Sequence, residues 1–268
     1  MVGDFGDFKR GLQCQVEVDW KGMASEERAR LTDQRREQAE HDQKLRQAAA
    51  ARAAMTAAAL WSNASRCGAS EYLTRKGVEP EACRYLQDGS IVIPLLRYDE
   101  PRAQALKATQ RIWGDGTKRF SKGFQKAGVC LRLGLVVTDE PLLVCEGYAT
   151  GLTLRMAVHR RLPVFVALDA GNLLPVVELL RTLHPESRIL ICADDDHNTV
   201  GNPGREHARR ACQAVKDCRY TWPVFRPGRR GPKDTDMNDL HRLEGLPVVR
   251  RQLLHVLPLL GCKVLRAA

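Results

Sequence analysis

The sequence predicts an α/β protein whose C-terminal part is built around a parallel sheet flanked by helices. Three observations support this prediction. From Leu142 onward, short apolar runs alternate with segments of helical pattern. A smaller stretch before it mixes strand patterns with many cations. Nearer the N-terminus lies a long segment without Gly or Pro. We therefore expect a charged N-terminal helix, then a smaller α+β basic subdomain, then the parallel sheet.

Composition narrows the classes of function. The chain has 268 residues and 44% hydrophobic content, which is enough for a core and excludes a disordered chain. Lys and Arg number 42 against 32 acids, and the formal charge of +10 favours an anionic partner such as nucleic acid. No apolar run reaches the roughly 20 residues that span a bilayer. The first residues, MVGDFGDFKRG, lack the apolar core of a secretory signal. We expect a soluble, cytoplasmic protein without a membrane partner.

Cysteine usage argues against a zinc module. The nine cysteines form no Cys-x-x-Cys pair. Cys145 and Cys192 lie inside apolar runs, which predicts buried structural thiols. Cys212 and Cys218 are close in sequence but have the wrong spacing for a zinc ribbon.

Residues 1–66 are predicted to be a lead-in followed by a solvated helix. Residues 1–22 are short, mixed and Gly-containing, which fits irregular structure or a small strand pair. The helix is expected over 25–59, because acids follow Ser25 and acids near a helix start favour the macrodipole. Large apolar residues are sparse in its first half, so a linker helix without activity is the simplest interpretation.

Residues 67–138 are predicted to form the basic α+β subdomain. EYLTRKGVEPEACRYL has the pattern of two helices broken near Pro80. SIVIPLLRYDE predicts a strand that reaches an acidic turn. ALKATQRIWGDGTKRF predicts a strand, a Gly-Asp-Gly turn and a second strand, which together make a hairpin.

Cations and aromatic rings are interleaved between Arg102 and Arg132, where Asp115 is the one acid. The cations are Lys107, Arg111, Lys118, Arg119, Lys122, Lys126 and Arg132, and the rings are Trp113, Phe120 and Phe124. This mixture fits a groove for a single nucleic-acid strand, with cations for phosphates and rings for bases. It equally fits an ordinary basic surface whose rings lie in the core.

Residues 139–258 carry the alternating pattern of the parallel sheet, and 259–268 form a tail. The apolar runs are LLVC, VFVAL, RILICA and YTWPVF. Helices are expected near 152–160, up to 183, over 204–216 and from about 238. Right-handed crossovers then give a parallel sheet, and ligands bind such sheets at the carboxyl ends of the strands.

Acidic and amide side chains follow each of the apolar runs. They are Glu146, then Asp169 and Asn172, then Asp194, Asp195 and Asp196, and finally Asp234, Asp236, Asn238 and Asp239. Converging hard oxygen ligands suit Mg²⁺ or Mn²⁺. In an extended loop Asp194 and Asp196 point the same way and can share an ion. Asp195 points away, and we expect it to matter least.

Two such ions can clamp the attacking and leaving oxygens of phosphoryl transfer. Glu146 is then a general base or acid, or a further ligand. Each piece alone also has a simpler interpretation: an Asp-rich turn is commonly a solvated loop or helix cap, and Glu146 alone can accept bonds from backbone N–H groups. The combination of strand ends favours the metal site.

LLVCEGYATG, ILICADDD with NPGR, and DTDMNDL in this order resemble a Toprim domain, the Rossmann-like catalytic module of bacterial-type primases, some topoisomerases and some nucleases. The wording is most similar to primases of plasmids, phages and integrative elements. The resemblance implies that Glu146, Asp194 and Asp196 are catalytic and bind Mg²⁺ or Mn²⁺. It implies a third acidic motif at Asp236 and Asn238, with Asp236 as a further ligand.

Upstream, EYLTRKGV, GSIVIPL, TQRIWGDGTKRF and SKGFQKAG resemble the basic subdomain that precedes Toprim in DnaG-like replicative primases. By that resemblance Arg111, Lys118, Lys122 and Lys126 contact template or incoming nucleoside triphosphate. The chain departs from those primases in three ways. Thr150 replaces a second acid, so a metal contact is lost or comes from elsewhere, with Asp169 as one source. A zinc ribbon and a helicase domain are not expected.

The resemblance implies a primase that makes short RNA primers on a single-stranded DNA template from ribonucleoside triphosphates, with a helicase or another replication protein as helper. Two alternatives stay open. A Toprim nuclease needs the same metals but no basic subdomain. A nucleic-acid-binding replication accessory keeps the fold without catalysis. A topoisomerase needs a tyrosine nucleophile on another large domain, for which this chain has no room.

Overall fold

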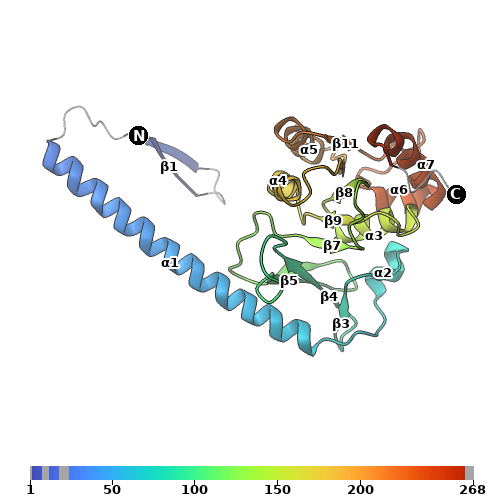
Figure 1. Cartoon of the computed structure of the whole chain (residues 1–268), viewed down its shortest axis with the longest axis horizontal. Coiled ribbons are helices and arrows are strands. Elements are labelled where there is room, and N and C mark those ends of the chain that lie inside the picture. The colour runs from blue at the N-terminus through green and yellow to red at the C-terminus, as the bar shows by residue number, and fades with distance from the viewer. Residues whose placement is uncertain (1, 8–11, 18–23, 263–268) are drawn as a thin grey trace. The chain divides into compact units, whose positions relative to one another are not determined.

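The computed structural model describes residues 2–7, 12–17 and 24–262, which fall into two compact units, Met1–Ala48 and Ala49–Ala268 (Figure 1). In the first unit β1 (Val2–Asp7) pairs antiparallel with β2 (Leu12–Glu17), with Val2 opposite Glu17. The lead-in therefore contains the small strand pair that its composition allowed.

Helix α1 (Ser25–Asn63) begins in the first unit and ends in the second. Glu26 and Glu27 occupy its first turn, as its sequence predicts. Ala53 and Ala57 are its buried residues, and most of the remaining side chains are exposed. The prediction of a solvated helix is confirmed, although α1 continues four residues beyond the expected end at 59.

The second unit contains a four-stranded antiparallel sheet in the order β3-β4-β5-β6. Its strands are β3 (Arg84–Tyr85), β4 (Ile91–Leu96), β5 (Leu106–Ile112) and β6 (Lys118–Phe120). The predicted hairpin is confirmed as β5 and β6. Its turn is held by the Asp115 carboxylate, which accepts from the backbone N–H of Thr117 at 2.8 Å.

The prediction of two helices around Pro80 is wrong in its second half. Helix α2 (Glu71–Lys76) forms and ends at Gly77, whose φ of 64° is left-handed. The segment after Pro80 instead enters β3, where Tyr85 exchanges backbone hydrogen bonds with Ser65 at 2.8 and 2.9 Å. Only a few residues separate Pro80 from this pairing, so tertiary hydrogen bonds override the local helical pattern.

A five-stranded sheet in the order β11-β10-β8-β9-β7 forms the rest of the unit. The parallel strands are β8 (Leu142–Cys145), β9 (Val164–Val166), β10 (Ile189–Cys192) and β11 (Cys218–Thr221). Strand β7 (Leu131–Leu133) adds an antiparallel edge beside β9, which the sequence did not predict. The fold class, a parallel sheet flanked by helices after a smaller α+β region, is confirmed.

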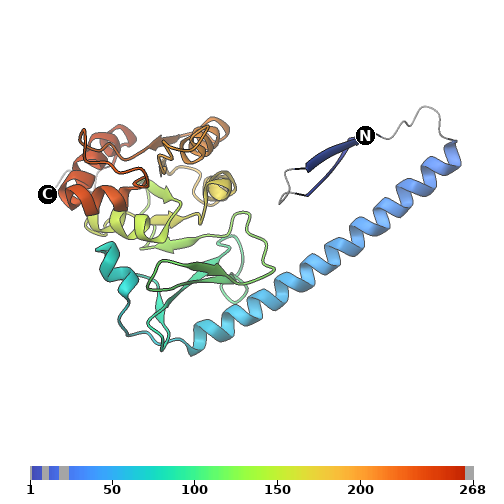
Figure 2. The same ribbon diagram turned by 180° about the vertical axis from the view of Figure 1, so that it is seen from behind.

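Helices cover both faces of this sheet (Figures 1 and 2). Helices α3 (Tyr148–Ala157), α6 (Met237–Glu244) and α7 (Leu246–Val256) pack on one face with Leu143 and Cys145. Helices α4 (Leu173–Leu183) and α5 (Pro203–Ala214) pack on the other with Val144 and Ile191. Two short 3-10 segments, η1 (Ala170–Asn172) and η2 (Leu257–Leu260), complete the unit. No helix among the described residues is long and apolar enough to cross a membrane.

The two sheets share one core. Leu96 at the end of β4 and Cys130 next to β7 exchange backbone hydrogen bonds at 2.9 and 3.0 Å. The apolar cluster that contains Ile91 and Ile93 of β4 also contains Leu143 of β8. Residues 49–268 therefore behave as one compact unit, and a boundary at 138/139 stays a prediction.

The core cysteines are buried thiols, as the sequence predicts, and two further cysteines contact each other outside the core. Cys145 and Cys192 are buried free thiols, as predicted. Cys212 of α5 and Cys218 of β11 bring their Sγ atoms to 3.1 Å. The described cysteines are free thiols, and no His, Cys, Asp or Glu cluster among the described residues has the arrangement of a metal site.

Candidate active site

Glu146 and Asp194 meet at the carboxyl ends of β8 and β10. These strands are adjacent and parallel, with Cys145 opposite Cys192, so the residues that follow them emerge side by side. Glu146 Oε1 and Asp194 Oδ1 are both buried, and neither has a hydrogen-bond partner among the described residues. Burying an unpartnered carboxylate oxygen is costly, so this pair calls for a proton or a cation.

The electrostatics of the pair agree with that reading. Burial, followed by the charges of Asp196, Asp169 and Asp236, raises the pKa of Glu146 to about 7, although a hydrogen bond from the Asp194 backbone N–H acts to lower it. Burial, followed by the charge of Glu146, raises the pKa of Asp194 well above its usual range. The pKa of Asp239 is also raised, first by burial and then by Asp236. The carboxylates therefore repel one another more than their surroundings neutralise them.

Asp196 is fixed by the start of α5. Its Oδ2 accepts from the Gly204 N–H at 2.9 Å, and its own N–H donates to Asn202 Oδ1 at 2.9 Å. Asn202 also caps α5. A Cβ at Gly204 would lie 2.5 Å from the Asp194 carbonyl oxygen, so only glycine allows this approach. The Asn-Pro-Gly segment thus explains how a helix starts directly against the acidic loop.

Asp236 caps α6 and receives a hydroxyl from α3. Its Oδ1 accepts from the Asp239 N–H at 2.8 Å within a capping box. Thr150 Oγ1 donates to Asp236 Oδ2 at 2.9 Å, and Thr150 is 1% exposed. Thr150, which stands where replicative primases are expected to carry an acid, therefore binds an acid. Asp169, the possible substitute for that acid, pairs with Lys126.

Asn238, which the sequence places in the third acidic motif, faces away from the acids. It donates to the Lys76 carbonyl at 2.8 Å and to Thr153 Oγ1 at 2.9 Å. His241 on the next turn contacts the Gly77 carbonyl at 2.9 Å. Asn238 therefore fastens α2 to α6. The Lys76 ammonium lies 3.8 Å from Asp239, and sequence reasoning missed it. The sequence signal that could have identified Lys76 is its position in the last turn of α2, directly before Gly77.

The acidic residues fit a divalent cation through the chemistry of their free oxygens. Asp196 and Asp236 each accept a hydrogen bond from a backbone N–H, and no group of three ligands is already arranged for a metal among the described residues. Glu146 Oε1 and Asp194 Oδ1 have no such bond. Hard, buried carboxylate oxygens suit Mg²⁺ or Mn²⁺, which keep several waters and need few protein ligands. The ligand roles themselves stay predictions.

Lys118 of β6 lies within electrostatic range of the acids. Loss of hydration at its ammonium and the nearby charge of Lys76 lower its pKa, whereas Asp236 and Asp194 raise it. The ammonium therefore interacts with both Lys76 and the acidic cluster, and the side chain as a whole is exposed. Lys122 follows in the next loop and has no ion-pair partner among the described residues. Lys126 is predicted to bind template or nucleotide, but its ammonium already forms an ion pair with Asp169. Asp169 would therefore compete with a bound phosphate for this ammonium.

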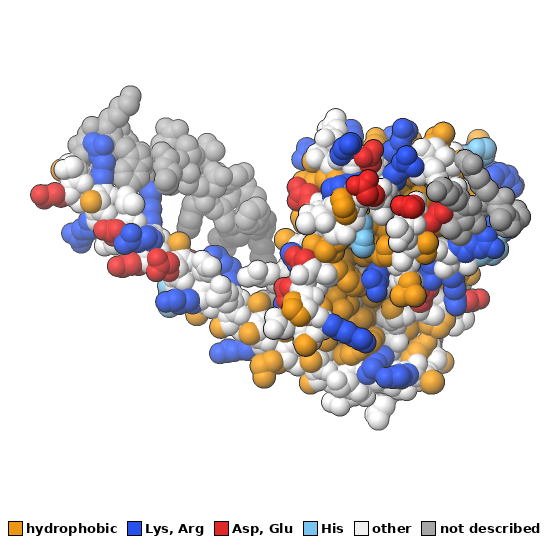
Figure 3. All heavy atoms as spheres, in the orientation of Figure 1, with side chains coloured by type: hydrophobic (Ala, Val, Ile, Leu, Met, Phe, Trp, Pro, Cys, Tyr) orange, Lys and Arg blue, Asp and Glu red, His pale blue; other side chains and the backbone are white. Residues whose placement is uncertain are grey.

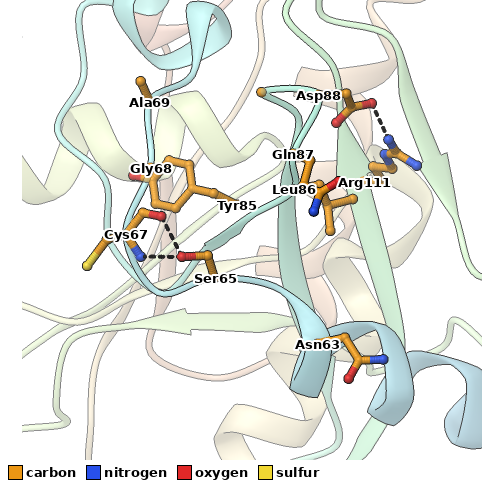
Figure 4. A pocket seen from close by; sticks show the side chains of 11 residues that line it. Asn63, Ser65, Cys67, Gly68, Ala69, Tyr85, Leu86, Gln87, Asp88 and Arg111 are labelled. Atoms are coloured by element: carbon orange, nitrogen blue, oxygen red, sulfur yellow. Dashed lines mark hydrogen bonds and ion pairs between the residues drawn. The ribbon is translucent and has the colours of Figure 1, made fainter.

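Arg111 lies on the opposite face of the antiparallel sheet. It pairs across the sheet with Arg119, whereas Lys118 pairs with Ile112, and side chains of successive residues alternate between faces. Figure 4 shows the Arg111 guanidinium bound to the Asp88 carboxylate. It also donates to Ser90 Oγ at 2.8 Å and lies 4.5 Å from the Trp113 ring.

Arg111 lines a pocket of about 750 Å³ that includes Ser65, Tyr85 and Asp88. The structure thus separates Arg111 from Lys118, although the sequence grouped the two together. Lys and Arg side chains are also interspersed with acidic and apolar ones on the described part of the face in Figure 3, instead of forming one stripe.

The aromatic rings of the basic segment lie partly in solvent. Phe120 is 38% exposed and its ring centroid lies 5.8 Å from that of Phe124. Trp113 is half-buried beneath the Arg111 and Arg119 guanidinium groups. Phe124 also packs against the core cluster, whereas the exposed part of Phe120 is available to stack on a base.

Asp195, expected to matter least, has the most side-chain partners of the three consecutive aspartates. Its side chain is 8% exposed and forms ion pairs with Arg230 at 2.7 Å and Arg205 at 3.5 Å. Burial acts to raise its pKa, but bonds from Asn202 and Arg230 outweigh it and hold the pKa below the usual range. The Asp195 carboxylate thus belongs to a structural network of Asn202, Arg205 and Arg230. Sequence reasoning missed Arg230 altogether.

Comparison with known proteins bears on this region. Residues 141–246 match the family model of the Toprim domain, so the resemblance to that domain is confirmed for this part of the chain.

Solved structures give more distant similarities. The primase fragment of the bacteriophage T7 primase-helicase protein is 14% identical, with a TM-score of 0.46 over 68% of this chain and 70% of that chain. The DnaG catalytic core is 17% identical, with a TM-score of 0.43 over 72% of this chain and 65% of that chain.

Proposed function

We propose, on the premise that residues 141–246 are a Toprim domain, that this protein is a primase-like nucleotidyltransferase. It would make short RNA primers on a single-stranded DNA template from ribonucleoside triphosphates, with Mg²⁺ or Mn²⁺. One observation supports the proposal most: Glu146 and Asp194 carry buried oxygens without a hydrogen-bond partner among the described residues, and Asp194 acts electrostatically on Lys118 of the preceding basic sheet.

Each residue has a task that follows from its surroundings. Glu146 and Asp194, with Asp196 and Asp236, would hold the divalent cations, which supply charge neutralisation for phosphoryl transfer when bound. Without a cation Glu146 has a pKa of about 7, so in place of a ligand role it could hold or release a proton near neutral pH as a general acid or base. Asp196 and Asp236 are pre-oriented by helix-cap bonds, which reduces the reorganisation needed to bind.

The lysines would supply the anion-binding part of the site. Lys118 and Lys76 lie beside the acids and are placed to bind phosphate groups of a triphosphate. Lys122 would contact the template backbone, and Lys126 would do so only when it releases Asp169. Arg111 would touch a different part of the strand, since it lies on the other face of the sheet.

A non-catalytic nucleic-acid-binding accessory is the second candidate. Thr150 in place of an acid favours it, because the hydroxyl binds Asp236 and offers no ligand charge. A Toprim nuclease is less well supported, because it has no need of the basic antiparallel sheet. In either catalytic case we expect the protein to act in the cytoplasm, within a mobile genetic element's replication, with a helicase or another replication protein as partner.

Primer synthesis tests the proposal directly. The protein is incubated with single-stranded DNA, the four ribonucleotides and Mg²⁺ or Mn²⁺, and short RNA is the expected product. Glu146→Gln should remove the product, whereas Glu178→Gln, an exposed acid on α4, should not. Absence of RNA with every metal and template would overturn the primase proposal. DNA cleavage would favour the nuclease, and DNA binding without either reaction would favour the accessory.

A further inference from the structure

We infer that Arg230 is a positioning residue that holds the two acidic segments 194–196 and 234–236 together, so that divalent-cation binding depends on it. This inference rests on the proposed use of the acidic cluster as a cation site. Arg230 does not touch Glu146, Asp194 or Asp236 in any described contact, and acts through Asp195 and the backbone.

Arg230 contacts both acidic segments at once. Its Nη1 donates to Asp195 Oδ2 at 2.7 Å, and its Nη2 donates to the Asp195 carbonyl at 2.5 Å. Its Nε donates to the Asp234 carbonyl at 2.8 Å. The Asp195 N–H completes the connection by donating to the Thr235 carbonyl at 2.8 Å. One guanidinium therefore fixes the spacing between the strand β10 end and the start of α6.

Asp195 extends this connection to a third segment. Asn202 Nδ2 donates to its other oxygen, Oδ1, at 2.6 Å, and Arg205 Nη1 lies 3.5 Å from the same atom. Asn202 also accepts from the Asp196 N–H and caps α5. Both oxygens of Asp195 are thus occupied, and the loop that carries Asp194 and Asp196 is held from both sides.

Repulsion among the nearby acids explains why the two acidic segments need such a connection. Glu146, Asp194 and Asp236 repel one another, and that repulsion would push the loops apart without a cation bound. Arg230 supplies positive charge next to this cluster but spends its donors on Asp195 and carbonyl groups. The metal-facing oxygens therefore stay free while the loops stay close.

The planar fork of arginine suits this place better than lysine. Three N–H groups of Arg230 reach three acceptors at fixed angles, and its guanidinium lies 4.9 Å from the Phe225 ring. The flexible ammonium of lysine offers no such planar set. Arg229, the preceding residue, is exposed and donates to the Leu243 carbonyl at 3.3 Å, so it is a matched control in the same loop.

Binding of Mn²⁺ to the free full chain tests the inference, measured from the loss of the electron paramagnetic resonance signal of free Mn²⁺. We expect Arg230→Met to weaken Mn²⁺ binding at least 10-fold, Arg230→Lys to fall between it and wild type, and Arg229→Met to stay within twofold. Melting temperatures in EDTA report folding. In primer synthesis, Arg230→Met should raise the Mn²⁺ concentration for half-maximal rate far more than it lowers the rate at saturating Mn²⁺.

Several outcomes overturn the inference. One is a folded Arg230→Met variant that binds Mn²⁺ with wild-type affinity. Another is a wild-type protein that binds no Mn²⁺. If Arg230→Met fails to fold, Asp195→Asn takes its place, because it keeps the shape and removes the charge that Arg230 contacts. Unchanged Mn²⁺ affinity in that variant also overturns it. If wild type binds Mn²⁺ and depends on Arg230 but makes no RNA, the proposed function fails and the positioning role stands.

Discussion

The two sheets of this protein differ in whether the charged side chains around them have partners of opposite charge. Around the antiparallel sheet the cations are matched by local acids: Arg97 with Asp99, Lys107 with Glu100, and Arg111 with Asp88. At the carboxyl edge of the parallel sheet, acids gather and two of their buried oxygens have no partner among the described residues. Several cations around the antiparallel sheet are thus neutralised locally, whereas the two buried acids of the other edge are not.

This difference teaches that net charge does not locate a binding surface. A formal charge of +10 draws attention to every Lys and Arg, yet a cation in a surface ion pair contributes little that is free for a partner. Uncompensated groups are more informative. Here they are Glu146 and Asp194 on one side and Lys118 and Lys122 on the other, and they come from different sheets.

Removing one of the partnerless acids gives the largest expected effect. Asp194→Asn should lower primer synthesis by about 1000-fold or more, because it removes a charge that stabilises the reaction only through the bound cation. The melting temperature in EDTA should not fall, since a buried and uncompensated carboxyl is lost. Asp217→Asn, an exposed acid after α5, is the control. A variant with full activity would remove Asp194 from the site.

Gly204→Ala probes the close approach behind the acidic loop. Its Cβ would lie 2.5 Å from the Asp194 carbonyl, so the loop or α5 must shift, which typically costs about 1–3 kcal/mol. Urea unfolding and Mn²⁺ titration should both show a loss. Gly171→Ala is the matched control, because its nearest contact is Asp169 Oδ1 at 3.4 Å. Equal behaviour of the two variants would contradict the packing argument.

The pH dependence of stability tests the partnerless state itself. The pKa of Glu146 is raised from 4.5 to about 7 in the folded protein, so its contribution is fully present below pH 4.5 and lost as pH rises through 7. In EDTA, Glu146→Gln should therefore exceed wild type in unfolding free energy by about 3 kcal/mol at pH 8. The two should be nearly equal at pH 4.5. A difference that shrinks as pH rises would refute the assignment.

Substitution of Thr150 tests the difference between an acid that accepts a side-chain hydrogen bond and the acids that have no donor. Thr150→Val removes the hydroxyl that donates to Asp236 at 2.9 Å and should cost about 1 kcal/mol in urea unfolding. Thr150→Ser keeps the hydroxyl and should lose less. Equal losses in the two variants would mean that the methyl group, and not the hydrogen bond, matters at this position.

The smallest effects concern the cations. Lys118→Ala and Lys122→Ala should each weaken binding of single-stranded DNA severalfold and reduce its salt dependence, because an unpaired cation releases counterions on binding. Arg111→Ala should change the salt dependence less, because Asp88 already neutralises it. Fluorescence anisotropy over a salt series measures both. A larger effect at Arg111 would reverse the contrast between paired and unpaired cations.

The sequence was most informative where a local pattern carries the signal. An apolar run followed at once by Glu or Asp predicts both a buried strand and a polar strand end, so β8, β10, Glu146 and Asp194 follow from it. Strand β7 has three residues and pairs with β9, more than 30 positions away in the chain, so no local pattern marks it.

Orientation was the other limit. Arg111 and Lys118 share a hairpin, but a shift of one residue in register moves a side chain to the other face, and only the pairing decides this. Arg230 lies in a loop with other cations, and its role depends on where that loop meets Asp195. The composition of the loop is the same whether or not that contact forms.

Helix α6 contacts both the acidic edge and the C-terminal end of α2. Its first residue follows Asp236, and its Asn238 and His241 hold the C-terminal end of α2, next to Lys76. A ligand that tightens the docking of α2 and a cation that tightens the acidic edge thus act on the same helix. By thermodynamic linkage, if the first ligand raises the affinity for the cation by some factor, the cation raises the affinity for the first ligand by the same factor. Under the proposed function, a substrate that carries both phosphates and a bound cation would engage both ends of this helix, and its two contacts would then be coupled.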